Sequence, residues 1–189
     1  MAQNKVKFNL KGVYFSKVTE TVNTAGVTTY SYATPVAWPG AVSLSLDQSG
    51  GESTFYAEGI AYYVTVANNG YSGDFESALI PDAFKTDILK ETANTTAGTL
   101  IEYSTVEPEA FALLFQFDGD QNAIKHVLYN CKCTRPSIGS QTNEDTKEVR
   151  TETLTITASP RADGLVKASC ANTSGTAYST WTSTVYVPS

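Results

Sequence analysis

Few residues of this chain could perform acid–base or nucleophilic chemistry. Asp74 and Glu76 are two residues apart in an alternating segment, so both project from one face of the expected strand, as the carboxylate pair of a glycosidase would. No aromatic platform for a sugar is identifiable around them, and a solvated strand face is the simpler interpretation. The single histidine, His126, lies in the middle of another expected strand, and no G-x-S-x-G nucleophile motif occurs. We therefore expect no catalytic residues and no enzymatic activity.

Candidate metal ligands are equally sparse. Asp118, Asp120 and Asn122 resemble the opening of a calcium loop, but the sixth and twelfth positions hold Ala123 and Tyr129 where such a loop needs glycine and glutamate. We interpret this stretch as a hairpin turn. The sequence predicts no metal site and no cofactor.

The three cysteines are Cys131, Cys133 and Cys170. An odd count argues against a disulfide framework. Cys131 and Cys133 share one face of a strand, but two thiolates do not make a zinc site. Buried free thiols are the expected state.

The composition favours a soluble β protein. The chain has 189 residues, of which 11% are aromatic and only 17% charged, with a net charge of −6. Lys and Arg form no cluster that would bind phosphate. The N-terminal MAQNKVKFNL lacks the apolar region of a signal peptide, and AFALLF (110–115) is too short to span a bilayer. We expect a single domain over 1–189, made in the cytoplasm.

Short alternating runs predict a mainly β fold, either a two-sheet β-sandwich or a barrel. Gly12 breaks the alternation of the first run and indicates a β-bulge. NNG at 68–70 predicts a tight turn. The expected strands cover 5–10, two ribbons within 18–34, 35–46, 58–66, 71–80, 111–117, 124–134, 151–158, 165–170 and the end of the C-terminal tail.

Two details of this fold can be tested directly. Residues 151–158 and 165–170 are expected to form an antiparallel hairpin with Leu154 and Ile156 in the core. In 124–134, alternation predicts that Val127, Tyr129, Cys131 and Cys133 share one face, opposite Ile124 and Leu128.

One short amphipathic helix is expected at about 81–91. Pro81 suits the first helical position, Asp82 lies near the positive end of the helix dipole, and Phe84 and Ile88 share a face. Two polar segments, 47–53 and 135–148, are expected to be loops that are mobile in the free subunit and become ordered on assembly.

Five blocks of the sequence carry a resemblance to a known family. The chain resembles the major tail protein, or tail tube protein, of long-tailed phages and prophages of Gram-positive bacteria, and the order of the blocks agrees over most of its length. The blocks are TPVAWPGAVSLSLD, NNGYSGDFESALIPDAFKTDIL, FALLFQFDGDQNAIKHVLYNCKCTRPS, TETLTITASPRADGLVKA and WTSTVYVP.

The resemblance implies a structural virion protein of two packed β-sheets with a short flanking helix. Subunits would close into hexameric rings that stack into a tube around the tape measure protein, between the tail terminator and the distal tail proteins. The tube is the conduit for DNA ejection, and localisation would be the virion tail. The joint at 68–84 would hold the helix outside a sheet whose other face lines the pore.

The charge of the chain adds an expectation about that pore. Six copies of −6 give −36 for each ring. Lysines on the wall would bind phosphates of passing double-stranded DNA. We therefore expect a lumen of Asp, Glu, Ser, Thr, Asn and Gln, and no affinity of the subunit for duplex DNA. In the alternative, the acidic charge lies on the outer surface.

Two other functions remain open at this stage. The chain could be the tube protein of a contractile injection or secretion device, which shares the fold. It could instead be a monomeric β-sandwich module that binds a ligand such as carbohydrate, in which case Trp38 and Trp181 would have to supply an exposed aromatic groove.

Overall fold

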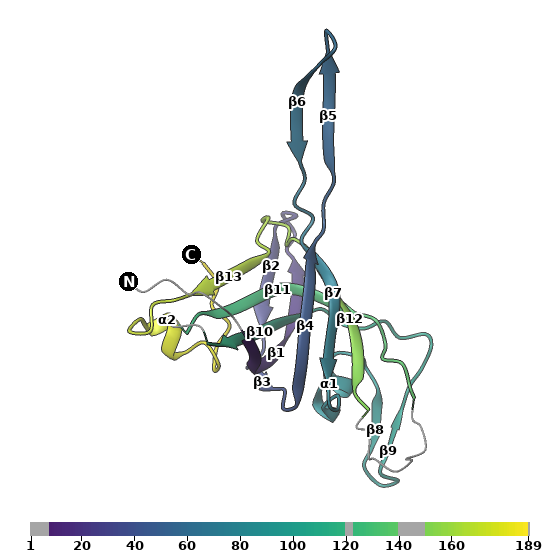
Figure 1. The fold of residues 1–189 in the computed structure, drawn as a ribbon. Helices are drawn as coiled ribbons and strands as arrows, with labels where there is room; N and C mark the ends of the chain where they lie inside the picture. Colours follow the sequence, from purple (N-terminus) through teal and green to yellow (C-terminus); the bar gives the residue numbers. More distant parts are fainter. Residues whose placement is uncertain (1–7, 120–122, 140–149, 189) are drawn as a thin grey trace, which may run out of the picture.

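The computed structural model describes residues 8–119, 123–139 and 150–188 of the chain. The strands are β1 (Phe8–Val22), β2 (Thr28–Tyr32), β3 (Val36–Ala37), β4 (Ala41–Gln48), β5 (Glu52–Ala57), β6 (Ile60–Val66), β7 (Tyr71–Ser77), β8 (Thr92–Asn94), β9 (Thr99–Ile101), β10 (Phe111–Asp118), β11 (Lys125–Cys133), β12 (Glu152–Ala158) and β13 (Lys167–Cys170). Two short helices complete them, α1 (Asp82–Asp87) and α2 (Thr176–Ser179). The expectation of a mainly β fold is confirmed (Figure 1).

One nine-stranded antiparallel sheet forms the body of the molecule. Its main path runs β2-β1-β10-β11-β12-β7-β4, and β13 and β3 pair with β11 and β1 outside that path. The sheet is curved, because β4 at one end also contacts β1 near the other. This curvature encloses the apolar face of a single sheet, where the sequence predicted either a two-sheet sandwich or a barrel. The pairs β5–β6 and β8–β9 form small sheets of their own.

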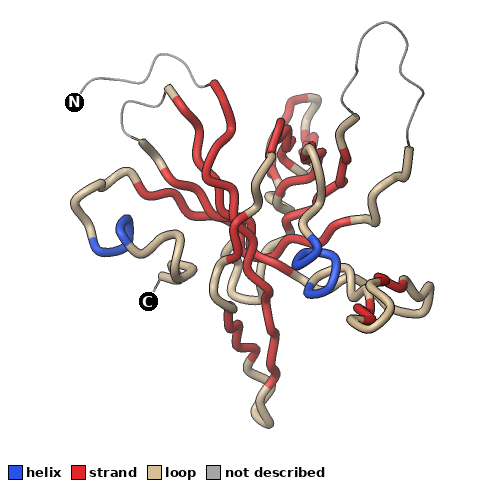
Figure 2. Tube along the Cα trace, turned by 90° about the horizontal axis from the view of Figure 1, so that it is seen from below, coloured by secondary structure: helices blue, strands red, loops and turns tan. Residues whose placement is uncertain are grey.

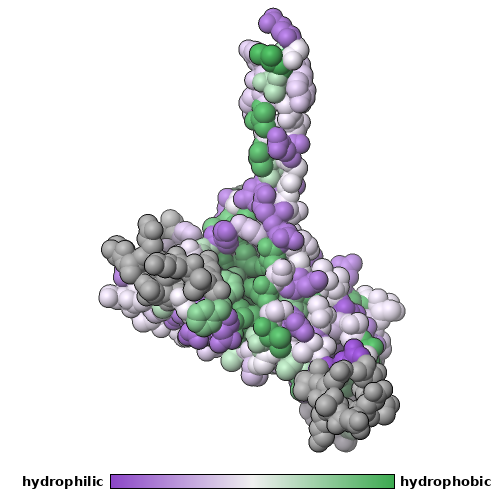
Figure 3. All heavy atoms as spheres, viewed as in Figure 1, coloured by the Kyte–Doolittle hydropathy of each residue, from purple (hydrophilic) through white to green (hydrophobic). Residues whose placement is uncertain are grey.

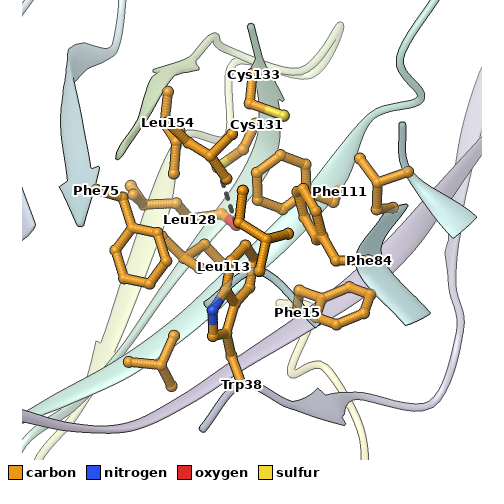
Figure 4. Close-up of a cluster of buried hydrophobic side chains, with 14 of the residues drawn as sticks. Phe15, Trp38, Phe75, Phe84, Phe111, Leu113, Leu128, Cys131, Cys133 and Leu154 are labelled. Atoms are coloured by element: carbon orange, nitrogen blue, oxygen red, sulfur yellow. Dashed lines mark hydrogen bonds between the residues drawn. The ribbon is translucent and has the colours of Figure 1, made fainter. Parts of the chain in front are cut away.

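The enclosed face carries the larger of two apolar clusters, which we call the inner core. Aromatic rings meet edge to face at its centre, with Trp38 and Phe75 centroids 4.9 Å apart and Phe84 and Phe111 centroids 5.1 Å apart (Figure 4). The Trp38 indole N–H donates to the Ser77 hydroxyl at 2.9 Å, so its one polar atom is satisfied. The buried members are Val13, Phe15, Trp38, Phe75, Ile80, Phe84, Ile88, Leu89, Phe111, Leu113, Leu128, Cys131, Cys133, Leu154, Ile156 and Ala158.

The opposite face of β10 and β11 carries a second cluster, the outer core. It consists of Val18, Ala112, Leu114, Val127, Tyr129, Trp181 and Val185. The C-terminal segment contributes Trp181 and Val185, so it covers strands that are apolar on both faces. This segment contains α2 and turns, and the expected C-terminal strand is wrong. Figure 2 shows α1 and α2 lying apart, with the strands between them.

The expected hairpin between 151–158 and 165–170 is wrong. β12 pairs with β7 along its length and with Cys131–Cys133 of β11, whereas β13 pairs with Lys125–Leu128 of β11. The two strands therefore follow one another along the same edge of β11. Between them the chain leaves the sheet, and the Arg161 guanidinium lies 4.4 Å from the Tyr30 ring centroid. Leu154 and Ile156 are fully buried, as expected.

The alternation predicted for β11 is broken by a bulge. Phe111 pairs with Cys131, but Leu113 pairs with Leu128, so β11 has one residue more than β10 between these pairs. The extra residue places Cys131 and Cys133 on the side of Leu128, in the inner core, and leaves Val127 and Tyr129 in the outer core. The prediction that all four share a face is wrong for this reason. The bulge predicted at Gly12 is confirmed by the register shift between Lys11 and Tyr14.

The predicted helix is present but shorter than 81–91. Pro81 is its N-cap, with ψ of 141°, and the helix ends at Asp87. Lys90 has a φ of 61°, which terminates the helical path. Phe84 and Ile88 are both buried in the inner core, as their spacing predicted.

The loop expected at 47–53 is reduced to residues 49–51, and the tight turn expected at 68–70 is wrong. Asp47 and Gln48 end β4, Glu52 begins β5, and the chain passes from β6 through 67–70 directly into β7. Four strands thus form one long hairpin whose first part, β4–β7, lies in the sheet, and whose second part, β5–β6, leaves it (Figure 1). Of the other expected loop, 140–148 lies outside the described residues. Neither described helix is long and apolar enough to cross a bilayer.

Candidate assembly surface

Within the described residues, exposed apolar side chains are concentrated on the β5–β6 arm, residues 52–66. It extends away from the body as an isolated two-stranded ribbon (Figure 1). Among the described residues, seven of the 20 exposed large apolar side chains lie on these 15 positions. They are Phe55, Tyr56, Ile60, Tyr62, Tyr63, Val64 and Val66. A solitary hairpin is marginally stable in water, and an exposed apolar patch of this kind is typical of an interaction surface or of a segment prone to aggregation.

Both faces of the arm are apolar. Phe55 pairs with Tyr63 on one face, and the adjacent pair Thr54–Val64 lies on the other. Tyr62 is the extra residue of a bulge between the Phe55–Tyr63 and Tyr56–Ala61 pairs. Bulges redirect side chains, and Tyr62 is 72% exposed near the tip of the arm. A partner that covered one face only would leave the other in water.

The tip and the base of the arm have defined backbone geometry. Glu58 and Gly59 form the two-residue turn with φ values of 53° and 81°, as a type I′ hairpin requires. At the base, the Ser49 N–H donates to the Gly70 carbonyl and the Ala67 N–H donates to the Gly51 carbonyl. A Cβ on Gly70 would lie 1.9 Å from the Ala158 carbonyl oxygen, so the joint needs glycine there. The arm is therefore a continuation of the β4–β7 ladder.

The outward side of β4, β7 and β12 forms a second surface, which we call the polar face. Its side chains stand in three cross-strand rows, Ser43–Glu76–Thr153, Ser45–Asp74–Thr155 and Asp47–Ser72–Thr157. Hydrogen bonds tie neighbouring strands together, from Thr155 Oγ1 to Asp74 Oδ1 at 2.9 Å and from Ser43 Oγ to Glu76 Oε2 at 3.0 Å. None of these three strands contains Lys or Arg.

The carboxylates considered for catalysis belong to this polar face. Hydrogen bonds from Thr151 and Ser43 lower the pKa of Glu76, although slight burial opposes them. A general acid needs the opposite shift. Glu76 therefore acts here as a carboxylate acceptor between strands. Asp74, on the same face, accepts the hydrogen bond from Thr155.

The other candidates from the sequence do not meet one another. His126 lies on β11 with its ring stacked on Phe115 at a centroid separation of 5.2 Å. Asp118 forms an ion pair with Lys11, and this contact lowers the pKa of Asp118. Asp120 and Asn122 lie outside the described residues. The described part of the chain holds no group of three or more His, Cys, Asp or Glu side chains suited to a metal ion.

The cysteines are free thiols. Burial raises the pKa of Cys131 strongly and that of Cys133 to about 12, so neither is a thiolate at neutral pH. Cys170 is partly exposed.

Neither tryptophan is available for ligand stacking. Trp38 is 3% exposed and belongs to the inner core, and Trp181 belongs to the outer core, where its N–H donates to the His126 carbonyl at 3.3 Å. The exposed aromatic groove that a carbohydrate module would need from these residues is absent.

An open apolar pocket of about 230 Å³ lies where the sheet divides. β13 borders it on one side and β4 with the start of β7 on the other, because β12 leaves the edge of β11 before β13 joins it. Figure 3 shows apolar side chains gathered on this side of the body, below the base of the arm. The lining residues are Leu44, Leu46, Tyr71, Phe115, Phe117, His126, Val127, Leu128, Lys167 and Ala168.

No family model matches the chain, and no curated protein matches it significantly. The surfaces described above are therefore interpreted from their own geometry. The sequence contained one signal for the arm, the apolar residues on both faces of 60–66. It identified neither the Glu58–Gly59 turn nor the pocket, since both depend on which strands pair.

Proposed function

We propose that this chain is a self-assembling structural protein, the major tail tube subunit of a long-tailed phage or prophage. In this function, subunits close into hexameric rings that stack into a conduit for DNA. The observation that carries the proposal is the β5–β6 arm, which exposes apolar side chains on both faces and is covered by none of the described residues of its own subunit. Full burial stabilises such side chains by about 1.5–3 kcal/mol each relative to exposure.

The polar face supports a conduit for DNA. Its Asp, Glu, Ser and Thr side chains match the lining expected of a wall along which a duplex moves without binding. Hydrogen bonds between neighbouring strands hold these rows in place, and the three strands carry no Lys or Arg that would bind phosphate. We assign this face to the lumen.

The remaining partners follow from the same proposal. A tube of this kind would enclose a tape measure protein and end on terminator and distal tail proteins. The tube of a contractile device would use the same subunit architecture. A sheath-binding outer surface would be the property that distinguishes it.

The direct test is assembly of the purified full chain. Light scattering after size-exclusion chromatography gives the mass, and negative-stain microscopy gives the shape. Concentrated protein should form rings or tubes of uniform diameter, and sulfate should favour them because it strengthens apolar burial. A strict monomer at high concentration, with or without sulfate, would contradict the proposal and favour a binding module.

A further inference from the structure

We infer that the apolar pocket between β13 and β4 receives the tip of the β5–β6 arm from a second copy of this chain. The inference rests on the proposed self-assembly and names the surface that accepts the arm. Tyr62 would occupy the pocket, and Glu58 would approach Lys167 at its rim.

Size and polarity fit this occupant. A cavity of about 150 Å³ accommodates benzene, so an open pocket of about 230 Å³ can hold one phenol ring with room at its mouth. The lining is mainly aliphatic and aromatic, and Lys167 is its one Lys or Arg side chain. A tyrosine can place its ring among the apolar side chains and keep its hydroxyl near polar groups at the rim.

Charge also fits. Residues 49–69 contain two acidic side chains, Glu52 and Glu58, and no Lys or Arg. The pocket is lined by no Asp or Glu, and its lining residue Lys167 has its Nζ 4.5 Å from the Tyr71 ring centroid and donates a hydrogen bond to the Tyr71 hydroxyl. An acidic arm and a basic rim attract one another and help to fix the register.

Geometry requires two copies. The arm starts beside the pocket, since Leu46 and Tyr71 line the pocket and the ladder continues from them into the arm. From Ser49 to Glu58 the strand extends about 30 Å away from the body at roughly 3.3 Å per residue (Figure 1). The tip therefore lies far from its own pocket. A projection on one end that fits a recess elsewhere on an identical molecule gives head-to-tail contacts, which build closed rings or open stacks.

Exchange of the two charges provides the first test. Glu58→Lys and Lys167→Glu should each raise the critical concentration for tube formation about fivefold, and the double variant should restore it. Glu52→Lys, at the base of the arm, is the matched control and should have a smaller effect. Failure of the double variant to recover, with both single variants impaired, would overturn the pairing of Glu58 with Lys167.

Cross-linking provides a second test that does not depend on the strength of an ion pair. Tyr62→Cys and Ala168→Cys, combined with Cys170→Ser, should give a ladder of covalent oligomers with a short bismaleimide in assembled protein. Ser53→Cys with Ala168→Cys, which moves the thiol to the base of the arm, should give none.

The outcomes distinguish an error about the accepting pocket from an error about self-assembly. Tubes without a Tyr62–Ala168 ladder, or a ladder from Tyr62→Cys alone, would overturn the pocket as acceptor and leave the proposed function intact. A cross-link confined to the monomer would mean that the arm folds onto its own subunit and would also overturn the inference. Absence of assembly in the unmodified chain would overturn both proposals.

Discussion

The long hairpin of this protein has two halves with opposite surface chemistry. In β4–β7, apolar and polar side chains alternate, so Leu44 and Phe75 face the inner core while Asp74 and Glu76 face outward. In β5–β6, apolar side chains occupy both faces, and every residue of β6 is exposed. The backbone ladder runs from one half into the other through residues 49–51 and 67–70.

This difference shows what each half is built to contact. The β4–β7 half has one buried face and one solvent-exposed face, which is the usual pattern of antiparallel strands at the surface of a folded subunit. The β5–β6 half has the composition of strands buried on both faces, but the described part of its own subunit covers neither face. A chain that retains such a ribbon either aggregates through it or uses it for ordered assembly.

Replacement of the arm should give the largest effect. If residues 52–66 are replaced by an Asn-Gly turn, the β4–β7 ladder closes and we expect complete loss of tubes by electron microscopy. The free energy of unfolding should stay within about 1 kcal/mol of the unmodified chain, because the arm adds nothing to either core. Tubes that still form would show that the arm is not the assembly element.

Truncation of one aromatic residue in each half should show which half contributes to the stability of the subunit. Phe75→Ala removes a fully buried ring from the inner core and should cost about 3–5 kcal/mol in denaturant titration. Leu154→Ala, across the ladder from Phe75, should cost about 2–5 kcal/mol. Tyr63→Ala on the arm should change the free energy of unfolding by less than about 0.5 kcal/mol. Equal losses at Phe75 and Tyr63 would mean that the arm is buried in the subunit.

Lysines on the polar face test its assignment to the lumen. Thr153→Lys with Thr155→Lys should make assembled tubes bind a short duplex DNA, with affinity falling steeply as salt rises above about 50 mM. Thr95→Lys with Thr173→Lys adds the same charge at exposed positions outside this face. Binding by the control pair alone, or by the unmodified tubes, would place the polar face elsewhere than the lumen.

The smallest effect concerns the pH dependence of stability. Hydrogen bonds from Thr151 and Ser43 hold the pKa of Glu76 below its ordinary value of 4.5, so the unfolded chain binds the proton more tightly than the folded one. The stability that Glu76 contributes is present above pH 4.5 and is lost as pH falls through its folded pKa. Glu76→Gln should therefore be less stable than the unmodified chain at neutral pH, with the difference shrinking in acid.

The matched control is Glu58→Gln, which removes the same charge from the arm. Thermal unfolding from about pH 3 to about pH 7, a range that includes the ordinary carboxyl pKa, measures the stability of each variant relative to the unmodified chain. A Glu76→Gln difference that grows in acid would contradict the assignment.

Much of the local structure could be predicted from the sequence. Alternation correctly placed Leu154 and Ile156 in the core, the break at Gly12 indicated its bulge, and Pro81 followed by Phe84 and Ile88 indicated the helix. These features depend on residues that are only a few positions apart, so a short segment of the sequence is enough to predict them.

The pairing of strands was decided only by the tertiary structure. β12 and β13 look like a hairpin in sequence, yet they follow one another along β11, and Arg161 in the segment between them contacts Tyr30 and Tyr32. The pocket exists because of that arrangement. In the same way, FALLF in β10 and IAYYV in β6 are both continuous apolar runs, but β10 is covered by both cores whereas β6 is exposed. Periodicity records the chemistry of a strand's faces; whether those faces are covered depends on distant segments that reach them, or on another subunit.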